Sequence, residues 1–405
     1  MLDIGVGVRF CRPRMSKRPR ELPRSAPPED IIAAAAAVLG GSTRAKPADA
    51  VLREEMKRRD DLPALAKREI SATVFTYYRW RGWLGGIRSV EARMERALEL
   101  DRRFRMNPFT LSEEALRRKA VPEWLADFMD YPVHWLRSLQ REPSIWIRAR
   151  PGQARALAKK VGDCRPAKDT SLFEALQYRG TKDLFVTKEF REGEFEIQDI
   201  SSQAVGCLCA PQPGETWWDL CAGEGGKLLH LSDLMANRGL IWATDRVEWR
   251  LERLRARAAR AKCFNYRSVP WDGSQPPPFQ HPVDGVLVDA PCSGIGTWHR
   301  NPHARWTLTP GDVHELAHVQ VELLRKASAW VRPGGRLIYA VCTLTRAETI
   351  QVVATFGREA KGWEPLLQED PFRREMRASQ FMYWPQTTHG NGMFVAAWVR
   401  TKPDA

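Results

Sequence analysis

The chain of 405 residues lacks several features that would place it in other protein classes. It has no apolar stretch long enough to cross a membrane, and its N-terminal segment has no apolar core of the kind that a signal peptide needs. Its eight cysteines form no Cys-x-x-Cys pair and no His/Cys cluster of zinc type. We therefore expect a cytoplasmic protein with no metal site and no disulfide framework.

Acidic residues are in deficit, with 49 Asp and Glu against 63 Lys and Arg, and sixteen tryptophans accompany the excess positive charge of +14. Positive charge attracts phosphate backbones, and aromatic and guanidinium planes stack on unpaired bases. This composition indicates an RNA partner, although arginines on solvated helix faces contribute to it. In residues 246–262, Val247, Leu251, Leu254, Ala258 and Ala261 predict a buried helix stripe, with the arginines facing water.

Two apolar runs of strand length end in cysteine. The first is GVLVDAPCSG at residues 285–294, and the second is RLIYAVCTL at residues 336–344. Open α/β sheets carry their chemistry at the carboxyl ends of strands, so Cys292 and Cys342 are expected there, with Asp289 beside them. A single cysteine at such a place is more often packing than a nucleophile. A thiolate can, however, add to C6 of a pyrimidine, with an acid near N3, and this makes carbon 5 nucleophilic.

Upstream, the run TWWDL at residues 216–220 leads into the glycine-rich turn CAGEGGK at residues 221–227. Glycines let the backbone approach a ligand closely, and the first amides of a helix donate to it. A second strand, residues 239–244, ends at Asp245, where a carboxylate can hold ribose hydroxyls. The GxGxxG pattern of dinucleotide folds is absent, which favours S-adenosylmethionine over NAD.

Together these segments resemble the Sun (Fmu) family of RNA 5-methylcytosine methyltransferases, over about half of the chain. The matching segments are GEFEIQDISSQ (193–203), DLCAGEGGK (219–227), Asp245 with Arg250, WDG (271–273), DAPCSGIGTWHRNP (289–302), RPGGRLIYAVCTL (332–344) and GMF (392–394).

The resemblance implies a role for each matching residue. Cys342 is the nucleophile at C6, Cys292 assists release of the product, and Asp289 contacts cytosine and cofactor. S-adenosylmethionine is held by the turn, by Asp245 with Arg250, and by Asp272 near the adenine; the residues of the turn are Cys221, Ala222, Gly223, Glu224, Gly225, Gly226 and Lys227.

The chain departs from the family pattern at two places. Gly223-Glu224 replaces the usual Ala-Pro of the cofactor turn, and the added carboxylate is expected to reduce cofactor affinity. Ala340-Val341 replaces Ser-Thr before the cysteine, and only Glu348-Thr349 remains of an acidic and asparagine pair after it. Neither departure changes a reacting group.

The resemblance also implies the domain organisation. Residues 1–28 read as a disordered basic tail, in which translation could begin at Met1 or at Met15. Residues 29–120 are predicted to form an all-α NusB-like RNA-binding domain, and residues 121–192 a small α/β region that lines the RNA channel. Residues 193–402 are predicted to be the Rossmann-like methyltransferase domain.

Within these regions the pattern predicts individual elements. Helices are expected at 31–39, 48–59, 64–83, 88–104 and within 121–139, then a strand at 144–150, a helix at 151–161 opened by Pro151, and helices at 228–237 and 312–331. Strands are expected at 216–220, 240–244, 263–269, 283–289, 336–341 and 392–399, the last as an antiparallel edge strand, with a turn at 332–335. The cluster Tyr77, Tyr78, Arg79, Trp80, Arg81 and Trp83 is either an RNA surface or a set of core aromatics with a solvated arginine face.

The sequence therefore predicts a monomeric enzyme that methylates carbon 5 of a cytosine in structured RNA, most plausibly small-subunit ribosomal RNA. Transfer RNA is an alternative substrate. A DNA cytosine-5 methyltransferase would attack from Cys292 in the Pro-Cys pair, but the Glu-Asn-Val companion motif is absent. A non-catalytic ribosome-assembly factor is the third alternative. Such a protein would have no need of the two cysteines, yet Cys292 and Cys342 are both present, which argues against it.

Overall fold

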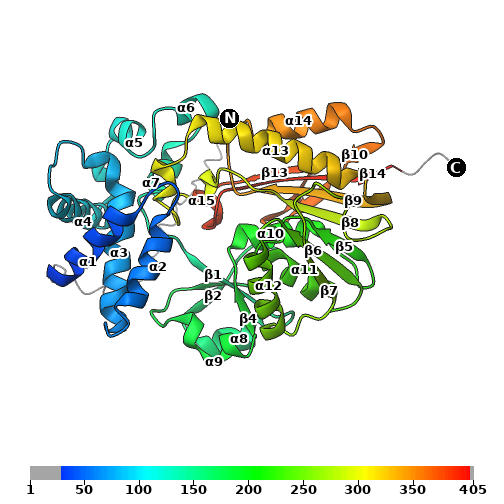
Figure 1. The fold of residues 1–405 in the computed structure, drawn as a ribbon, viewed down its shortest axis with the longest axis horizontal. Coiled ribbons are helices and arrows are strands. Elements are labelled where there is room, and N and C mark those ends of the chain that lie inside the picture. The colour runs from blue at the N-terminus through cyan, green and yellow to red at the C-terminus, as the bar shows by residue number, and fades with distance from the viewer. Residues whose placement is uncertain (1–28, 402–405) are drawn as a thin grey trace, which may run out of the picture.

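The structure is a computed structural model that describes residues 29–401 (Figure 1). The predicted basic tail, the choice between Met1 and Met15 as first residue, and Cys11 lie outside the described residues. In the described part no helix is long and apolar enough to cross a membrane.

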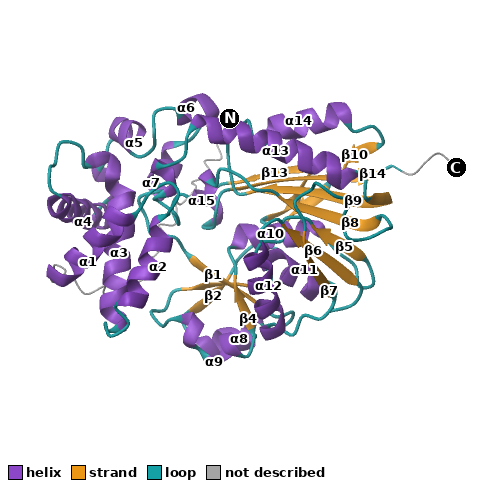
Figure 2. Ribbon diagram, viewed as in Figure 1, coloured by secondary structure: helices purple, strands orange, loops and turns teal. Residues whose placement is uncertain are grey.

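The N-terminal part is helical, as predicted, and lies at one end of the molecule (Figures 1 and 2). Its helices are α1 (Glu29–Gly41), α2 (Ala48–Arg58), α3 (Ala64–Trp80), α4 (Val90–Met106), α5 (Glu113–Lys119), α6 (Leu125–Phe128) and α7 (Val133–Ser138). The helix predicted to reach Trp83 ends at Trp80 and continues as one 3-10 turn, Arg81–Trp83.

The aromatic cluster of α3 belongs mainly to the core. Tyr78 and Trp80 are buried, and the Trp80 indole donates a hydrogen bond to Asp101 at 3.2 Å. The alternative of an RNA surface is therefore wrong for these two side chains. Of the two arginines in the cluster, Arg81 is exposed, as a solvated arginine face requires, but Arg79 is buried, so the prediction of a solvated face is wrong for Arg79.

A buried arginine joins the helical part to the rest of the chain. Arg305 is fully buried and donates hydrogen bonds to the carbonyls of Ala120 (2.9 Å) and Leu139 (3.1 Å). Burial lowers the pKa of Arg305 to about 9, and the nearby Arg79 charge adds to this effect. The next residue, Trp306, donates to the carbonyl of Tyr78 at 2.7 Å. These contacts pack the helices against the rest of the chain.

A small antiparallel sheet of four strands, in the order β2-β3-β1-β4, forms the middle region. Its elements are β1 (Ile145–Ala149), α8 (Ala154–Val161), β2 (Cys164–Pro166), β3 (Ala175–Tyr178), α9 (Lys188–Arg191) and β4 (Phe195–Ile197). The predicted strand is confirmed, but Pro151 does not open the helix. It lies in a turn with Gly152, whose φ is +74°, and α8 begins at Ala154.

An eight-stranded sheet, in the order β10-β14-β9-β8-β5-β6-β7 with β13 paired to β14, forms the second half of the chain. The strands are β5 (Thr216–Asp219), β6 (Leu240–Asp245), β7 (Tyr266–Pro270), β8 (Val283–Asp289), β9 (Val331–Val341), β10 (Trp363–Pro365), β13 (Gln380–Tyr383) and β14 (Met393–Arg400), and a separate hairpin is made by β11 (Gln368–Asp370) and β12 (Arg373–Ala378). Pairing from β9 through β7 is parallel, so the carboxyl ends of β5, β6, β8 and β9 meet at one edge.

Helices cover both faces of this sheet (Figure 1). The helices on one face are α10 (Ile200–Cys209), α11 (Gly226–Leu234) and α12 (Glu248–Arg260); α13 (Pro310–Ser328) and α14 (Ile350–Glu359) lie on the other, and α15 (Pro385–Thr388) precedes β14. Two apolar cores result, one containing Leu228 and Leu251 and the other Leu324 and Phe356. The predicted Rossmann-like fold class is confirmed.

Four details differ from the prediction. The last strand is antiparallel but lies inside the sheet, because β10 and β13 extend it. The turn at 332–335 lies within β9, which begins at Val331 because that residue already pairs with Val283. Helix α13 accordingly ends at Ser328 rather than 331. Cys263 closes helix α12, donating its backbone N–H to the Ala258 carbonyl, so β7 begins only at Tyr266.

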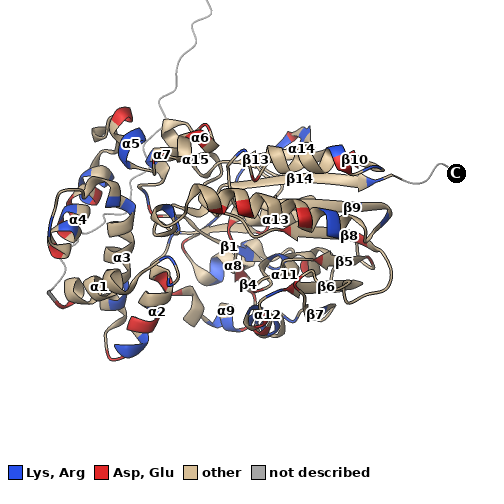
Figure 3. Ribbon diagram, turned by 45° about the horizontal axis from the view of Figure 1, so that its top comes forward, with Lys and Arg blue, Asp and Glu red and all other residues tan. Residues whose placement is uncertain are grey.

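The sequence pattern predicted that the arginines of α12 face water, and this prediction is wrong for two of them. Leu251, Leu254 and Ala258 are buried as expected. Arg257 and Arg260, however, bind the buried Glu196 at 3.0 and 2.6 Å, and so fasten the middle sheet to the methyltransferase domain. In the view of Figure 3, Lys and Arg positions (blue) and Asp and Glu positions (red) are interspersed along the helices.

Candidate active site

The two predicted cysteines meet at the edge where β8 and β9 end. The Sγ atoms of Cys292 and Cys342 are 3.2 Å apart, although fifty residues separate them in the sequence. The backbone N–H of Gly296, in the loop after Cys292, donates to the Cys342 carbonyl at 3.0 Å and so ties the two loops together. Both thiols are partly exposed, so a substrate can reach them.

The Cys292 thiol is held in its protonated form. The hydrogen bond with Cys342 raises the pKa of Cys292 well above its ordinary value, and burial adds to the shift. Either sulfur of the pair can be the donor of this hydrogen bond. Because the thiolate is the nucleophilic form of cysteine, the raised pKa disfavours attack by Cys292.

A buried ion pair lies next to the thiols. Lys227 Nζ and Asp289 Oδ2 are 2.5 Å apart, and the lysine is almost fully buried. Burial alone would lower the pKa of Lys227, but the charges of Asp289 and Cys342 outweigh it and the pKa is raised. Lys227 was predicted to hold the cofactor as part of the turn. Its ammonium group contacts Asp289, and its role toward the cofactor remains a prediction.

The predicted cofactor turn connects β5 to α11. Its backbone bends back on β6: the Ala222 N–H donates to the Thr244 carbonyl at 2.9 Å, and the Gly223 N–H donates to Asp245 Oδ2 at 3.0 Å. Gly225 has a φ of +83°, and a Cβ there would lie 2.7 Å from Leu254. Glycine is required at this position by conformation and by space.

The groups around this turn fit S-adenosylmethionine. The amides of α11 open toward the turn beside the buried Asp245 carboxylate, whose Oδ1 also accepts the Val247 N–H at 2.8 Å. Arg250 lies 3.9 Å from Asp245. A carboxylate fixed in this way can accept hydrogen bonds from ribose hydroxyls, and the helix N-terminus suits a carboxylate.

The other residues predicted for this site differ in their accessibility. Cys221 is half-buried and Ala222 buried within the turn. Asp272 is exposed, and hydrogen bonds from the hydroxyl and backbone N–H of Ser274 hold its pKa below the usual range. The Glu224 carboxylate pairs with Arg253 at 2.9 Å. This exposed ion pair offsets part of the added charge, and the effect of Glu224 on cofactor affinity remains a prediction.

Asp245→Ala tests the ribose contact. Loss of one or two charge-assisted hydrogen bonds is expected to weaken S-adenosylmethionine binding by roughly 10–100-fold. Titration calorimetry measures this directly, and Asp61→Ala serves as the comparison because its carboxylate is exposed and lies in the helical N-terminal part. Unchanged affinity in Asp245→Ala would remove this residue from the site.

Asp219 is a site residue that the sequence reasoning missed, although it opens the matching motif. It ends β5 and is buried beneath the turn. Burial raises its pKa to about 7, and the charge of Asp289 adds to the shift. The only sequence signal was its place at a strand end.

The raised pKa of Asp219 predicts a pH dependence of stability. The unfolded chain has an ordinary carboxyl pKa of about 3.9, so between that value and about 7 the folded state binds more protons. Its stabilising contribution is therefore complete at low pH and is lost as the pH rises to neutral. Urea unfolding at several pH values is expected to show this fall in the wild type and a flatter profile in Asp219→Asn. Equal profiles would contradict it.

Glu348 is the second missed residue, and it connects the two cysteine loops. It is fully buried, and it accepts hydrogen bonds from the Ser293 N–H (2.8 Å) and hydroxyl (2.5 Å), and from Thr343 (3.0 Å), Thr345 (2.9 Å) and Gln320 (3.1 Å). Ser293 and Thr343 each follow a cysteine directly. Glu348 thus fixes the spacing of the two thiols.

Fold and site together define a class of protein. An open α/β sheet with a glycine turn after its central strand and an acidic residue ending the next strand is the Rossmann-like S-adenosylmethionine-dependent methyltransferase domain. Within the described residues no group of three His, Cys, Asp or Glu side chains could hold a metal ion.

Comparison with known proteins shows which family this domain resembles. Residues 206–399 match the family model described as 16S rRNA methyltransferase RsmB/F. The predicted resemblance is therefore confirmed.

Individual relatives agree with this assignment. The chain is 37% identical over 51% of its length to the "Probable ribosomal RNA small subunit methyltransferase B" of Synechocystis, and 31% identical over 62% to the ribosomal RNA small subunit methyltransferase B of Shewanella oneidensis; the matches cover 48% and 60% of those proteins. The chain thus spans about half the length of the curated relatives it matches. The solved structure titled PH0851 shares the fold, with a TM-score of 0.76 and 23% identity over 93% of this chain and 100% of that one.

Proposed function

We propose that the protein methylates carbon 5 of a cytosine in structured RNA, and that its substrate is small-subunit ribosomal RNA. The observation that carries this proposal is the pair of thiols 3.2 Å apart at the sheet edge, beside the Lys227–Asp289 ion pair. A methyltransferase acting on an oxygen or an exocyclic nitrogen needs no cysteine nucleophile. The C5 of cytosine does need one, because it becomes nucleophilic only after a thiolate has added to C6.

The geometry supports distinct roles in the reaction. Before attack, Lys227 holds the Asp289 carboxylate in place and keeps positive charge near the Cys342 sulfur. The Cys342 thiolate forms the bond to C6, and the ring electrons move toward N3, which takes a proton from the Lys227–Asp289 pair: the ammonium gives up this proton through the Asp289 carboxylate, and Lys227 becomes neutral. S-adenosylmethionine, when bound by Asp245 and the turn, supplies the electrophilic methyl group.

Product release reverses the addition. Carbon 5 loses its proton to a base, the bond between C6 and Cys342 breaks, and N3 returns its proton through Asp289 to Lys227, which restores the ion pair. Cys292 stands 3.2 Å from the departing sulfur and carries the proton that stabilises it as a thiolate. This assigns elimination to Cys292.

The alternatives receive less support. A DNA-type mechanism would use Cys292 as the nucleophile, but the high pKa of this thiol opposes it. A non-catalytic assembly factor would have no need of the Glu348 hydrogen bonds that fix the two thiols. Transfer RNA remains the alternative substrate; the choice of ribosomal RNA rests on the names of the relatives.

The predicted NusB-like character of residues 29–120, the RNA channel of residues 121–192, the cytoplasmic location and the monomeric state remain predictions. The helical part does pack against the methyltransferase domain through Arg305. This packing supports the proposal that the helical part positions RNA near the thiols.

Methyl transfer to defined RNAs tests the proposed function. The purified protein is incubated with labelled S-adenosylmethionine and with transcripts of small-subunit ribosomal RNA or transfer RNA, and the nucleosides are identified by mass spectrometry. We expect 5-methylcytidine in the ribosomal transcript alone. Label in another nucleoside would refute the chemistry, whereas label in transfer RNA would change the substrate only.

A further inference from the structure

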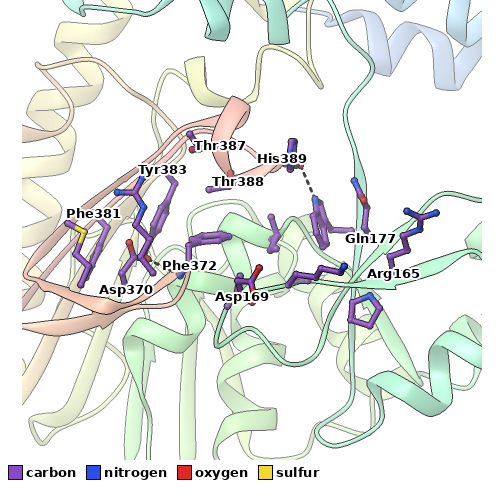
Figure 4. Close-up of a pocket in the computed structure, with 18 of the residues that line it drawn as sticks. Arg165, Asp169, Gln177, Asp370, Phe372, Phe381, Tyr383, Thr387, Thr388 and His389 are labelled. Carbon is purple, nitrogen blue, oxygen red and sulfur yellow. Dashed lines mark hydrogen bonds between the residues drawn. The ribbon is translucent and has the colours of Figure 1, made fainter. Parts of the chain in front are cut away.

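A cavity of about 650 Å³ lies between the middle sheet and the methyltransferase domain, and it contains neither cysteine (Figure 4). Arg165 and Gln177 of β2 and β3 line one side. Phe372 of the β11–β12 hairpin and Tyr383 of β13 line the other, and His389 lies across the top. Its size is that of pockets that hold a ligand the size of a nucleotide.

The cavity wall is connected to the catalytic loops. Trp146 of β1 donates a hydrogen bond to the His389 carbonyl at 2.9 Å. Three residues further on, the Gly392 N–H donates to the Gly296 carbonyl at 2.8 Å, and the Gly296 N–H in turn binds the Cys342 carbonyl. These hydrogen bonds couple the position of the cavity wall to that of the loop that carries Cys342.

The charge of the cavity is positive and largely uncompensated. Arg165, Lys168, Arg179 and Arg373 line it with exposed side chains. Among residues 29–401 no salt bridge joins any of these four to an acidic side chain. The one exposed acid in the lining is Asp169.

The second lining acid does not cancel this charge. Asp370 is buried and accepts the Phe372 N–H at 2.9 Å and the Tyr383 hydroxyl at 3.2 Å. Its hydrogen bonds hold the aromatic side of the cavity in place. Aromatic groups on one wall and free cations on the other are the pattern of sites that bind unpaired nucleotides, in which bases stack and phosphates meet positive charge.

We propose that this cavity binds an unpaired nucleotide of the RNA substrate that flanks the target cytosine. The proposal rests on the proposed function, because it takes the substrate to be RNA. The base enters between the aromatic wall and the Trp146 side, and the phosphates on either side of it contact Arg165 and Lys168. The cavity thus selects single-stranded RNA at the target.

The test compares two double variants: one lacks two exposed cations at the cavity, and the other lacks two exposed cations elsewhere. The variant Arg165→Ala, Lys168→Ala is compared with Arg358→Ala, Lys361→Ala, which removes equal charge from exposed positions at the end of α14, on the opposite face of the large sheet. The probe is the small-subunit ribosomal RNA transcript. The measurements are its Kd as a function of salt, KM and kcat for methylation, S-adenosylmethionine affinity, and the unfolding temperature.

For the cavity variant we expect RNA Kd and KM to rise roughly 10-fold, with a salt slope smaller by about 0.7 for each lost phosphate contact. Its kcat, cofactor affinity and unfolding temperature are expected to match the wild type, and the control variant is expected to change none of these. Equal RNA binding by the two variants, with the wild type active, overturns the cavity proposal. No 5-methylcytidine from the wild type on any RNA would instead overturn the proposed function.

Discussion

Cys342→Ala is expected to abolish methylation, with a loss on the order of 10⁴-fold or more in kcat, because no other group can activate carbon 5. Binding of RNA and of S-adenosylmethionine is expected to stay near wild type, since the side chain is small and only half-buried. Single-turnover methyl transfer measures the loss. Cys164→Ala is the matched control, because this thiol lies in β2, away from the site.

Cys292→Ala is expected to behave differently. Attack by Cys342 and methyl transfer proceed, but elimination stalls, so that enzyme accumulates in covalent linkage to RNA. The complex is expected to survive a denaturing gel and to disappear in the double variant Cys292→Ala, Cys342→Ala. Adduct in Cys342→Ala and none in Cys292→Ala would place the nucleophile in the Pro-Cys pair.

Asp289→Asn is expected to produce the second large effect, a fall of about 10²–10⁴-fold in the single-turnover rate. The amide cannot transfer a proton to N3, and it leaves the buried Lys227 ammonium without its counter-charge. RNA affinity, measured in parallel, separates this chemical effect from a binding defect.

Lys227→Met tests whether Lys227 and Asp289 act together in the reaction. If the two residues act as one unit, the double variant Lys227→Met, Asp289→Asn is expected to be little slower than Asp289→Asn alone. Additive losses would show that Lys227 acts independently of Asp289. A near-normal rate in Asp289→Asn would exclude the carboxyl from the protonation of N3.

The sequence was sufficient for those parts of the fold and site that follow local rules. Strand runs that end in Cys292 and Cys342 predicted a shared edge, because parallel strands align their carboxyl ends, and the structure brings these sulfurs together. The glycine turn was recognisable because Gly225 must have a positive φ beneath Leu254. The buried stripe of α12 followed from its period.

The remaining features depend on contacts between distant segments. Glu348 is one of many glutamates in the sequence, and only the folded loops show that it accepts hydrogen bonds from Ser293 and Thr343. Arg257 and Arg260 read as solvated charges until Glu196, more than fifty residues away, is placed against them. The last strand was predicted to be an edge strand because the neighbouring β10 and β13 are short and have only a weak strand pattern in the sequence.

Mass spectrometry of the RNA-linked Cys292→Ala protein, after nuclease and protease digestion, tests the central claim most directly. The account predicts a methylated cytidine nucleotide attached to the peptide that contains Cys342, and to no other peptide. A nucleotide attached to another residue, or a Cys342 adduct without the methyl group, would contradict it.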